Sequence, residues 1–70
     1  MSAQIKAAQS YWTGKRDEAA ANLDTLLNKP VASYGNPQAE INEWLRQFAE
    51  ATNVLSTINL ILQQANQVTN

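Results

Sequence analysis

Residues 38–70 contain neither Gly nor Pro, so nothing in this half of the chain interrupts a helix. Asn36 is a favourable N-cap residue, and Pro37 suits the first helical position. The sequence therefore predicts one long helix from residue 37 to about residue 68, which is roughly 48 Å at 1.5 Å per residue. Because helices gain most of their stability from packing, this one needs a surface to lie on.

The apolar residues of this predicted helix follow alternating steps of three and four. These are the a and d positions of a heptad pattern that continues over more than three heptads. Val54, Ile61 and Val68 flank them toward the C-terminus, whereas Leu60 lies on the opposite side. The a and d positions, which we call the apolar stripe, are Ile41, Trp44, Phe48, Ala51, Leu55, Ile58, Leu62 and Ala65.

The first part of the chain also has a helical pattern, from about residue 3 to residue 28. Its apolar face is expected to contain Ala19, Leu23, Leu26 and Leu27. Gly14 either ends a short first helix or is tolerated within a longer one, at a cost of about 1 kcal/mol relative to Ala. Residues 29–36 are expected to form a loop, because Pro and Gly residues are concentrated there.

These elements predict an all-α fold in a single domain, residues 1–70. Two helices joined by a short loop are expected to pack as an antiparallel hairpin. If the first helix is interrupted at Gly14, the short N-terminal helix becomes a third helix of the domain. A core this small is marginal alone. Since the chain has no Cys for disulfides and no His for zinc, a partner chain is the expected supplement.

The chain offers little to a catalytic mechanism, because His and Cys are absent. Acid–base chemistry would rest on Glu40, Glu43 and Glu50, which share the outer side of the second helix with Arg46. Their spacing of three and four residues predicts a solvated, ion-paired face instead. The glycines are isolated, so no phosphate-binding loop is predicted. We therefore expect no enzyme activity, no catalytic residue, no cofactor and no metal site.

The charge balance also restricts the partners. The net charge is −1, which provides no basic field for nucleic acid. Tyr11 and Trp12 stand near Lys15 and Arg16, but two acidic residues follow at once, so packing of Trp12 is favoured over stacking on a base. The most apolar run, residues 58–62, is too short for membrane insertion. No signal peptide is recognised, which leaves the cytoplasm, a virion or export without a cleaved signal as locations.

The last twenty residues carry no ionisable side chain, although they include much of the apolar stripe. Copies of such a helix can meet without like-charge repulsion or desolvation of ions. The predicted function is therefore a structural subunit that self-associates or docks into a larger assembly. The residues expected at the interface are Trp44, Phe48, Val54, Leu55, Ile58, Leu60, Ile61, Leu62 and Val68.

The layout of the chain is similar to the needle subunits of bacterial type III secretion, which are short helical hairpins. The similarity is carried by Asn36-Pro37 and by residues 53–58, Asn-Val-Leu-Ser-Thr-Ile. It implies a subunit of a self-assembled filament. The amide-rich residues 63–70 differ from the apolar and charged segment that closes that family, and no functional residue is carried over.

Two further resemblances involve the first helix. Residues 14–30, Gly-Lys-Arg-Asp-Glu-Ala to the closing Pro, look like the second helix of a tetratricopeptide repeat. This implies the alternative function, an adaptor or co-chaperone that binds one helical partner. Trp12-Thr13-Gly14 followed by Glu18-Ala19 resembles the Trp-x-Gly family of secreted hairpins, in which the motif joins two long helices.

Overall fold

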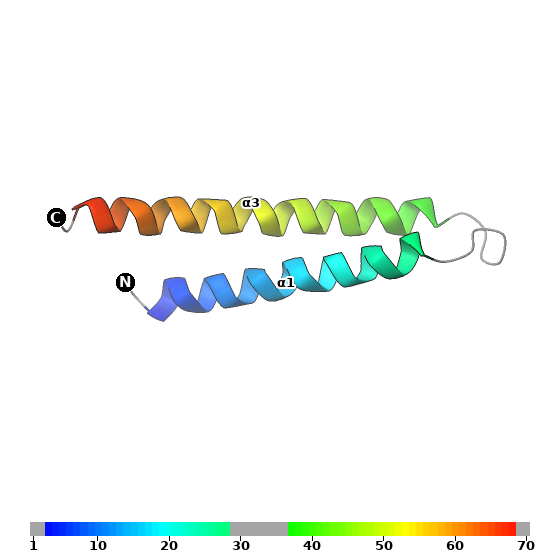
Figure 1. Cartoon of the computed structure of the whole chain (residues 1–70), viewed down its shortest axis with the longest axis horizontal. Coiled ribbons are helices and arrows are strands. Elements are labelled where there is room, and N and C mark those ends of the chain that lie inside the picture. Colours follow the sequence, from blue (N-terminus) through cyan, green and yellow to red (C-terminus); the bar gives the residue numbers. More distant parts are fainter. Residues whose placement is uncertain (1–2, 29–36, 69–70) are drawn as a thin grey trace.

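A computed structural model of the chain describes residues 3–28 and 37–68, with side chains described as far as residue 65. It contains two helices, α1 (Ala3–Leu27) and α3 (Gln38–Val68). The helices run antiparallel and pack against each other along their length (Figure 1). Within the described ranges the chain forms no strand. The predicted all-α helical hairpin is confirmed.

Helix α1 is continuous through Gly14, so the alternative with a third helix is wrong for the described part of the chain. Gly14 is exposed, and a methyl group added there would meet no atom within 4 Å. A glycine inside a helix costs only about 1 kcal/mol relative to Ala, which packing on either side of it can offset. The Trp12-Thr13-Gly14 motif therefore lies inside a helix and does not join two helices.

The described ends of the two helices are closed by local hydrogen bonds. The Asn28 backbone N–H donates to the Asp24 carbonyl at 3.2 Å, and its side-chain amide donates to the same oxygen at 2.8 Å. These bonds satisfy a carbonyl that the helix leaves unpaired. At the other helix, the Ile41 N–H donates to the Pro37 carbonyl at 3.0 Å. The predicted N-cap Asn36 and the loop at 29–36 lie outside the described residues.

The core between the helices is small, and the described side chains that are buried in it are all apolar. Ala19 and Ala51 are fully buried, with 0% of their surface exposed. No larger side chain in the described segments reaches that degree of burial. The apolar stripe supplies the α3 side of the core, and its other members are half-buried. The buried residues are Ala19 and Leu26 of α1 and Ala51, Leu55 and Ile58 of α3.

One residue of the predicted α1 face is placed differently by the structure. Leu26 is buried and Leu23 is half-buried, but Leu27 is exposed. Successive residues of an α-helix are about 100° apart, so Leu27 turns away from the direction in which Leu26 meets α3. Because α1 packs against only one helix, the face that it buries is narrower than the apolar face predicted from its sequence.

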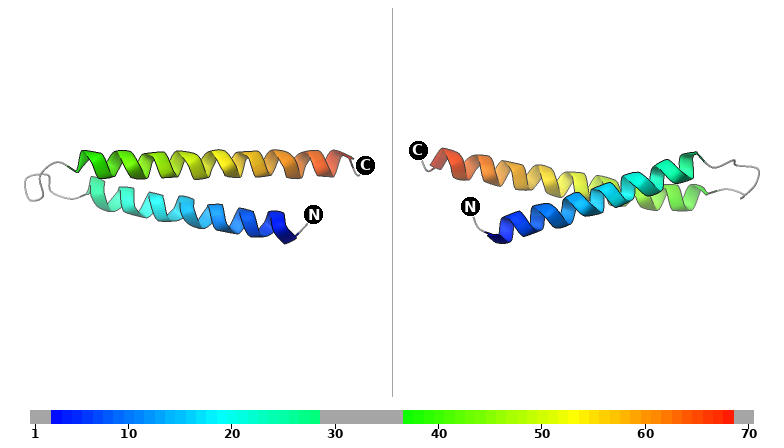
Figure 2. Two further views of the ribbon diagram at one scale, coloured as in Figure 1. Left: turned by 180° about the vertical axis from the view of Figure 1, so that it is seen from behind. Right: turned by 60° about the horizontal axis from the view of Figure 1, so that its bottom comes forward.

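The hairpin is long and thin. It measures 58 × 16 × 14 Å, and its radius of gyration is 16.5 Å, where a compact chain of this length has about 11 Å. Two views show that the helices cross at an angle and separate toward the termini (Figure 2). Helix α3 also extends beyond the start of α1 (Figure 1). Each helix therefore buries one face, and the rest of its surface stays exposed.

The accessible surface area also reflects the elongated shape of the hairpin. It is 5197 Å² for a chain of 7.7 kDa. A compact monomer of that mass is expected to expose about 4,300 Å². The chain thus exposes about 900 Å² more than a typical monomer of its size.

Candidate interaction surface

The structure divides the predicted interface residues into three groups by burial. Leu55 and Ile58 are buried within the hairpin, so they cannot contact a partner unless the two helices separate. Trp44, Phe48, Val54 and Leu62 are half-buried, and each keeps part of its side chain accessible. The exposed group consists of Leu60 and Ile61. Val68 lies in α3, but its side chain is outside the described residues.

Three more large apolar side chains are exposed among the residues whose side chains are described, and the sequence analysis did not assign them to an interface. They are Tyr11, Leu27 and Leu45. Together with Leu60 and Ile61, their exposed fractions run from 42% to 67%. Leu45 could have been found by the reasoning that found Leu60, because it is a leucine in α3 that belongs to no a or d position of the stripe.

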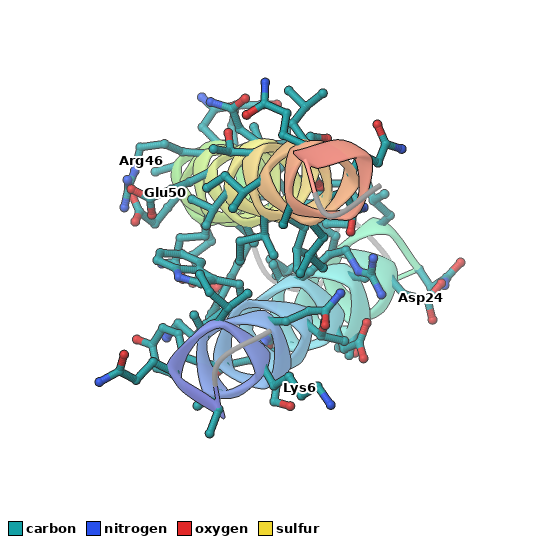
Figure 3. All side chains as sticks on the ribbon, turned by 90° about the vertical axis from the view of Figure 1, so that its left-hand side faces the viewer. Lys6, Asp24, Arg46 and Glu50 are labelled. Carbon is teal, nitrogen blue, oxygen red and sulfur yellow. The ribbon has the colours of Figure 1, made fainter. Side chains whose placement is uncertain are left out.

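Helical geometry places the exposed residues of α3 on opposite flanks of the hairpin. Leu55 marks the direction in which α3 faces α1. At 100° per residue, Leu45 lies about 80° to one side of Leu55 and Ile61 about 120° to the other. Val54 lies on the Ile61 flank, about 100° from Leu55. Glu50 shares this flank, since it is only about 20° from Ile61, and Figure 3 shows Glu50 on one side of the hairpin.

The exposed residues of α1 divide in the same way. Asp24 lies on the side of the hairpin opposite Glu50 (Figure 3). Leu27 is about 60° from Asp24 around the axis of α1, whereas Tyr11 is about 140° away. Leu27 therefore lies on the Asp24 side with Leu45, and Tyr11 lies on the Glu50 side with Ile61.

These positions define two apolar patches. The loop-end patch is on the Asp24 side and contains the end of α1 and the beginning of α3. The terminal patch is on the Glu50 side, toward the chain termini. The loop-end patch consists of Leu23, Leu27, Ile41, Leu45 and Phe48, and the terminal patch consists of Tyr11, Val54, Ile61 and Ala65.

The aromatic pair of α1 takes part in this arrangement. The rings of Tyr11 and Trp12 meet edge to face, with centroids 5.2 Å apart and planes at 87°. Trp12 is half-buried, so it fixes one side of the exposed Tyr11 ring. A rigid aromatic side chain contributes contact area at low entropic cost, which suits a protein interface.

The predicted ion pairs of α3 are present in the structure. Arg46 Nη2 lies 2.6 Å from Glu43 Oε2, and Arg46 Nη1 lies 4.0 Å from Glu50 Oε1. Hydrogen bonds from Arg46 and then from Gln47 lower the pKa of Glu43 from 4.5 to about 2. All three ionised groups are more than half exposed, so this face is a solvated one.

Within 3–28 and 37–68, no group of three Asp, Glu, His or Cys side chains is placed to hold a metal ion. Neither α1 nor α3 has the uninterrupted apolar length that a membrane-spanning helix requires. The surface with the most distinctive chemistry is therefore the apolar one.

Comparisons of the chain with protein-family models, curated proteins and solved structures gave no significant match. The resemblances to needle subunits and to tetratricopeptide repeats therefore rest on their motifs alone.

Proposed function

We propose that this chain is a non-enzymatic structural subunit, which self-associates or docks into a larger assembly of the secretion-filament or virion type. The contact is made through the apolar stripe of α3 and its flanks. The observation that carries the proposal is the partly exposed apolar surface on the C-terminal half of α3, where the sequence has no charge.

The size of the exposed surface supports this function. The hairpin exposes about 900 Å² more than a compact monomer of its mass. A standard protein interface buries about 800 Å² on each partner. Covering one such interface would bring the exposed surface of the chain close to that of an ordinary compact protein.

The chemistry of α3 after Glu50 supports it as well. Removing an ion from water is costly unless a partner compensates it, and this segment has no ion to remove. Its polar side chains are amides and hydroxyls. Some already bond within the helix, as Thr57 does when its hydroxyl donates to the Asn53 carbonyl at 3.1 Å. The apolar side chains can therefore be covered at low electrostatic cost.

The proposal is tested by the mass of the purified chain in solution over a hundredfold range of concentration, measured by sedimentation velocity. Species that grow with concentration are expected, and Ile61→Lys or Leu60→Lys is expected to abolish them. Gln63→Lys is the matched control for Ile61→Lys, because Gln63 is exposed on α3 about 160° from Ile61. A fixed monomer at all concentrations would refute self-association.

An adaptor that binds one helical partner is the second candidate. The part of α3 that extends beyond α1 favours it, because a partner helix could pack there against a single helix (Figure 1). A constant monomer that forms a stable 1:1 complex with an unrelated helical protein would support the adaptor over the structural subunit.

A further inference from the structure

The two halves of α1 are buried to different extents. Both buried side chains of this helix, Ala19 and Leu26, lie in its second half. Residues 3–18 have half-buried and exposed side chains, and none of them is buried. The two helices also separate toward the termini (Figure 2). The first half of α1 is therefore its more weakly packed half.

The segment of α3 beside this first half of α1 is better buried than α1 itself. The two run side by side in Figure 1, where blue and cyan α1 lies along yellow and orange α3. Ile58 in this segment is only 5% exposed, and Leu62 is half-buried. Within the described residues only α1 packs on α3, so α1 is what covers them. Residues 3–13, which we call the arm, thus cover apolar side chains while staying accessible themselves.

The side of the arm that meets α3 is only partly apolar. Its half-buried residues include the polar Gln9 and Thr13, and its large apolar side chains there are Ile5 and Trp12. Detaching the arm therefore returns few apolar groups to water. A helix this short is marginal without a packing partner, so a detached arm unravels.

Gly14 stands directly after the arm. It is exposed in the middle of α1, and an added methyl group would meet no atom within 4 Å, so packing does not require a glycine there. Glycine weakens a helix because its backbone loses the most conformational freedom on folding. The junction between the arm and the better-packed half of α1 is therefore a weak point of the helix.

We infer that the arm is a lid: it detaches from α3 and unravels as far as Gly14, while residues 19–27 stay packed on α3. Opening uncovers Ile58 and Leu62, which lie where the sequence carries no charge. The inference rests on the proposed function, because both residues belong to the predicted interface. It adds a regulation to that function, since the closed lid keeps this part of the stripe from a partner.

Thiol labelling tests the lid. The chain has no Cys, so one introduced cysteine reports the opening of its own site. Ile58→Cys lies under the arm, and Leu26→Cys is the matched control, since Leu26 is equally buried at 8% but lies in the other half of the hairpin. At low concentration, Ile58→Cys is expected to react about tenfold or more faster than its own global unfolding allows, with a weaker urea dependence, because a local opening exposes less surface. Leu26→Cys is expected to react only through global unfolding.

Two further substitutions separate local from global opening. Leu23→Ala weakens packing outside the arm, in the closed and the open state alike. It is expected to speed the labelling of Leu26→Cys and to leave that of Ile58→Cys unchanged. Gly14→Ala is expected to slow the labelling of Ile58→Cys about fivefold, because Ala resists unravelling at that position.

Hydrogen exchange of the unmodified chain covers the case in which a cysteine variant does not fold. The amides of residues 7–13 are expected to share one opening free energy and one urea dependence, with a step to stronger protection after Gly14. Protection that rises smoothly from residue 7 inward, with no step, is ordinary fraying of a helix end and would overturn the lid.

The remaining outcomes separate the lid from the proposed function. An equal response of Ile58→Cys and Leu26→Cys to Leu23→Ala means that the hairpin opens only as a whole, so the lid is wrong and self-association stands. If the lid regulates assembly, Gly14→Ala needs at least about fivefold more protein to assemble in sedimentation velocity. Assembly of Gly14→Ala at the same concentration as the unmodified chain overturns the regulation. An unmodified chain that labels as expected but never assembles refutes self-association, and the regulation with it.

Discussion

Arg46 and Glu43 lie one turn apart on α3, and Arg46 donates two parallel hydrogen bonds to the Glu43 carboxylate. Its Nη2 donates to Glu43 Oε2 at 2.6 Å and its Nε donates to Glu43 Oε1 at 3.3 Å. Gln47 Nε2 also donates to Oε2, at 3.0 Å. The Arg46 bonds and then the Gln47 bond lower the pKa of the Glu43 carboxyl from 4.5 to about 2.

This pKa shift predicts a dependence of stability on pH. The carboxylate has a lower pKa when folded than when unfolded, so it contributes stability above about pH 4.5 and loses that contribution as pH falls toward 2. Glu43→Gln is expected to make thermal melting less dependent on pH across this window. The effect is expected to be small and to weaken with salt, because both groups are more than half exposed.

Glu50→Gln is the matched control for that measurement. Glu50 meets the same arginine, but only at 4.0 Å and at one oxygen. Thermal melts followed by circular dichroism at pH 7, 4.5 and 2 are expected to depend on pH in this variant nearly as they do in the unmodified chain. An acid response of Glu43→Gln identical to that of the unmodified chain would contradict the role of the ion pair.

Gly14→Ala is expected to stabilise the hairpin. Gly14 lies in the middle of α1, and an added methyl group meets no atom within 4 Å. Replacing an exposed helical Gly by Ala contributes about 1 kcal/mol, which raises the melting temperature by about 4–8 °C in a domain of this size. Gly14→Pro, by contrast, is expected to break α1 and to reduce helix content. Unchanged or lower stability in Gly14→Ala would contradict a continuous α1.

Leu55→Ala is expected to destabilise the fold strongly. Leu55 is 9% exposed in the core, and truncating a buried leucine costs about 2–5 kcal/mol. For a chain of this length that is a large part of a total stability of about 4–10 kcal/mol. Leu60→Ala is the same chemical change at a side chain that is 58% exposed, and it is expected to cost about 0.5 kcal/mol or less.

Urea denaturation at low protein concentration compares these two variants without a contribution from assembly. Similar losses for Leu55→Ala and Leu60→Ala would mean that α3 does not face α1 through Leu55.

Ala51→Leu is expected to force the two helices apart. Ala51 is completely buried, so a larger side chain has no room unless the helices shift, and overpacking costs about 1–3 kcal/mol. Ala49→Leu is the control, because Ala49 is exposed two residues earlier on the same helix. Thermal melting is expected to fall for Ala51→Leu and to change little for Ala49→Leu. Equal melting temperatures would contradict a close approach at Ala51.

Local rules determined where helices can form in this chain. The absence of Gly and Pro after Pro37 allowed one long helix, and the structure has α3 from Gln38 to Val68. The alternating steps of three and four identified the face that packs, and Ala51, Leu55 and Ile58 of that stripe are buried. These features depend on the spacing of neighbours along one helix, so the sequence alone reveals them.

Only the tertiary structure decided which apolar residues stay exposed. The helix-propensity cost of Gly14 is small enough for packing to offset. The spacing of the apolar residues therefore could not show whether α1 continues through Gly14. Leu55 and Ile61 look equally suited to an interface in the sequence, yet Leu55 is buried and Ile61 is exposed, because α1 covers only one side of α3. Burial depends on where the second helix lies, and no pattern within a single helix contains that information.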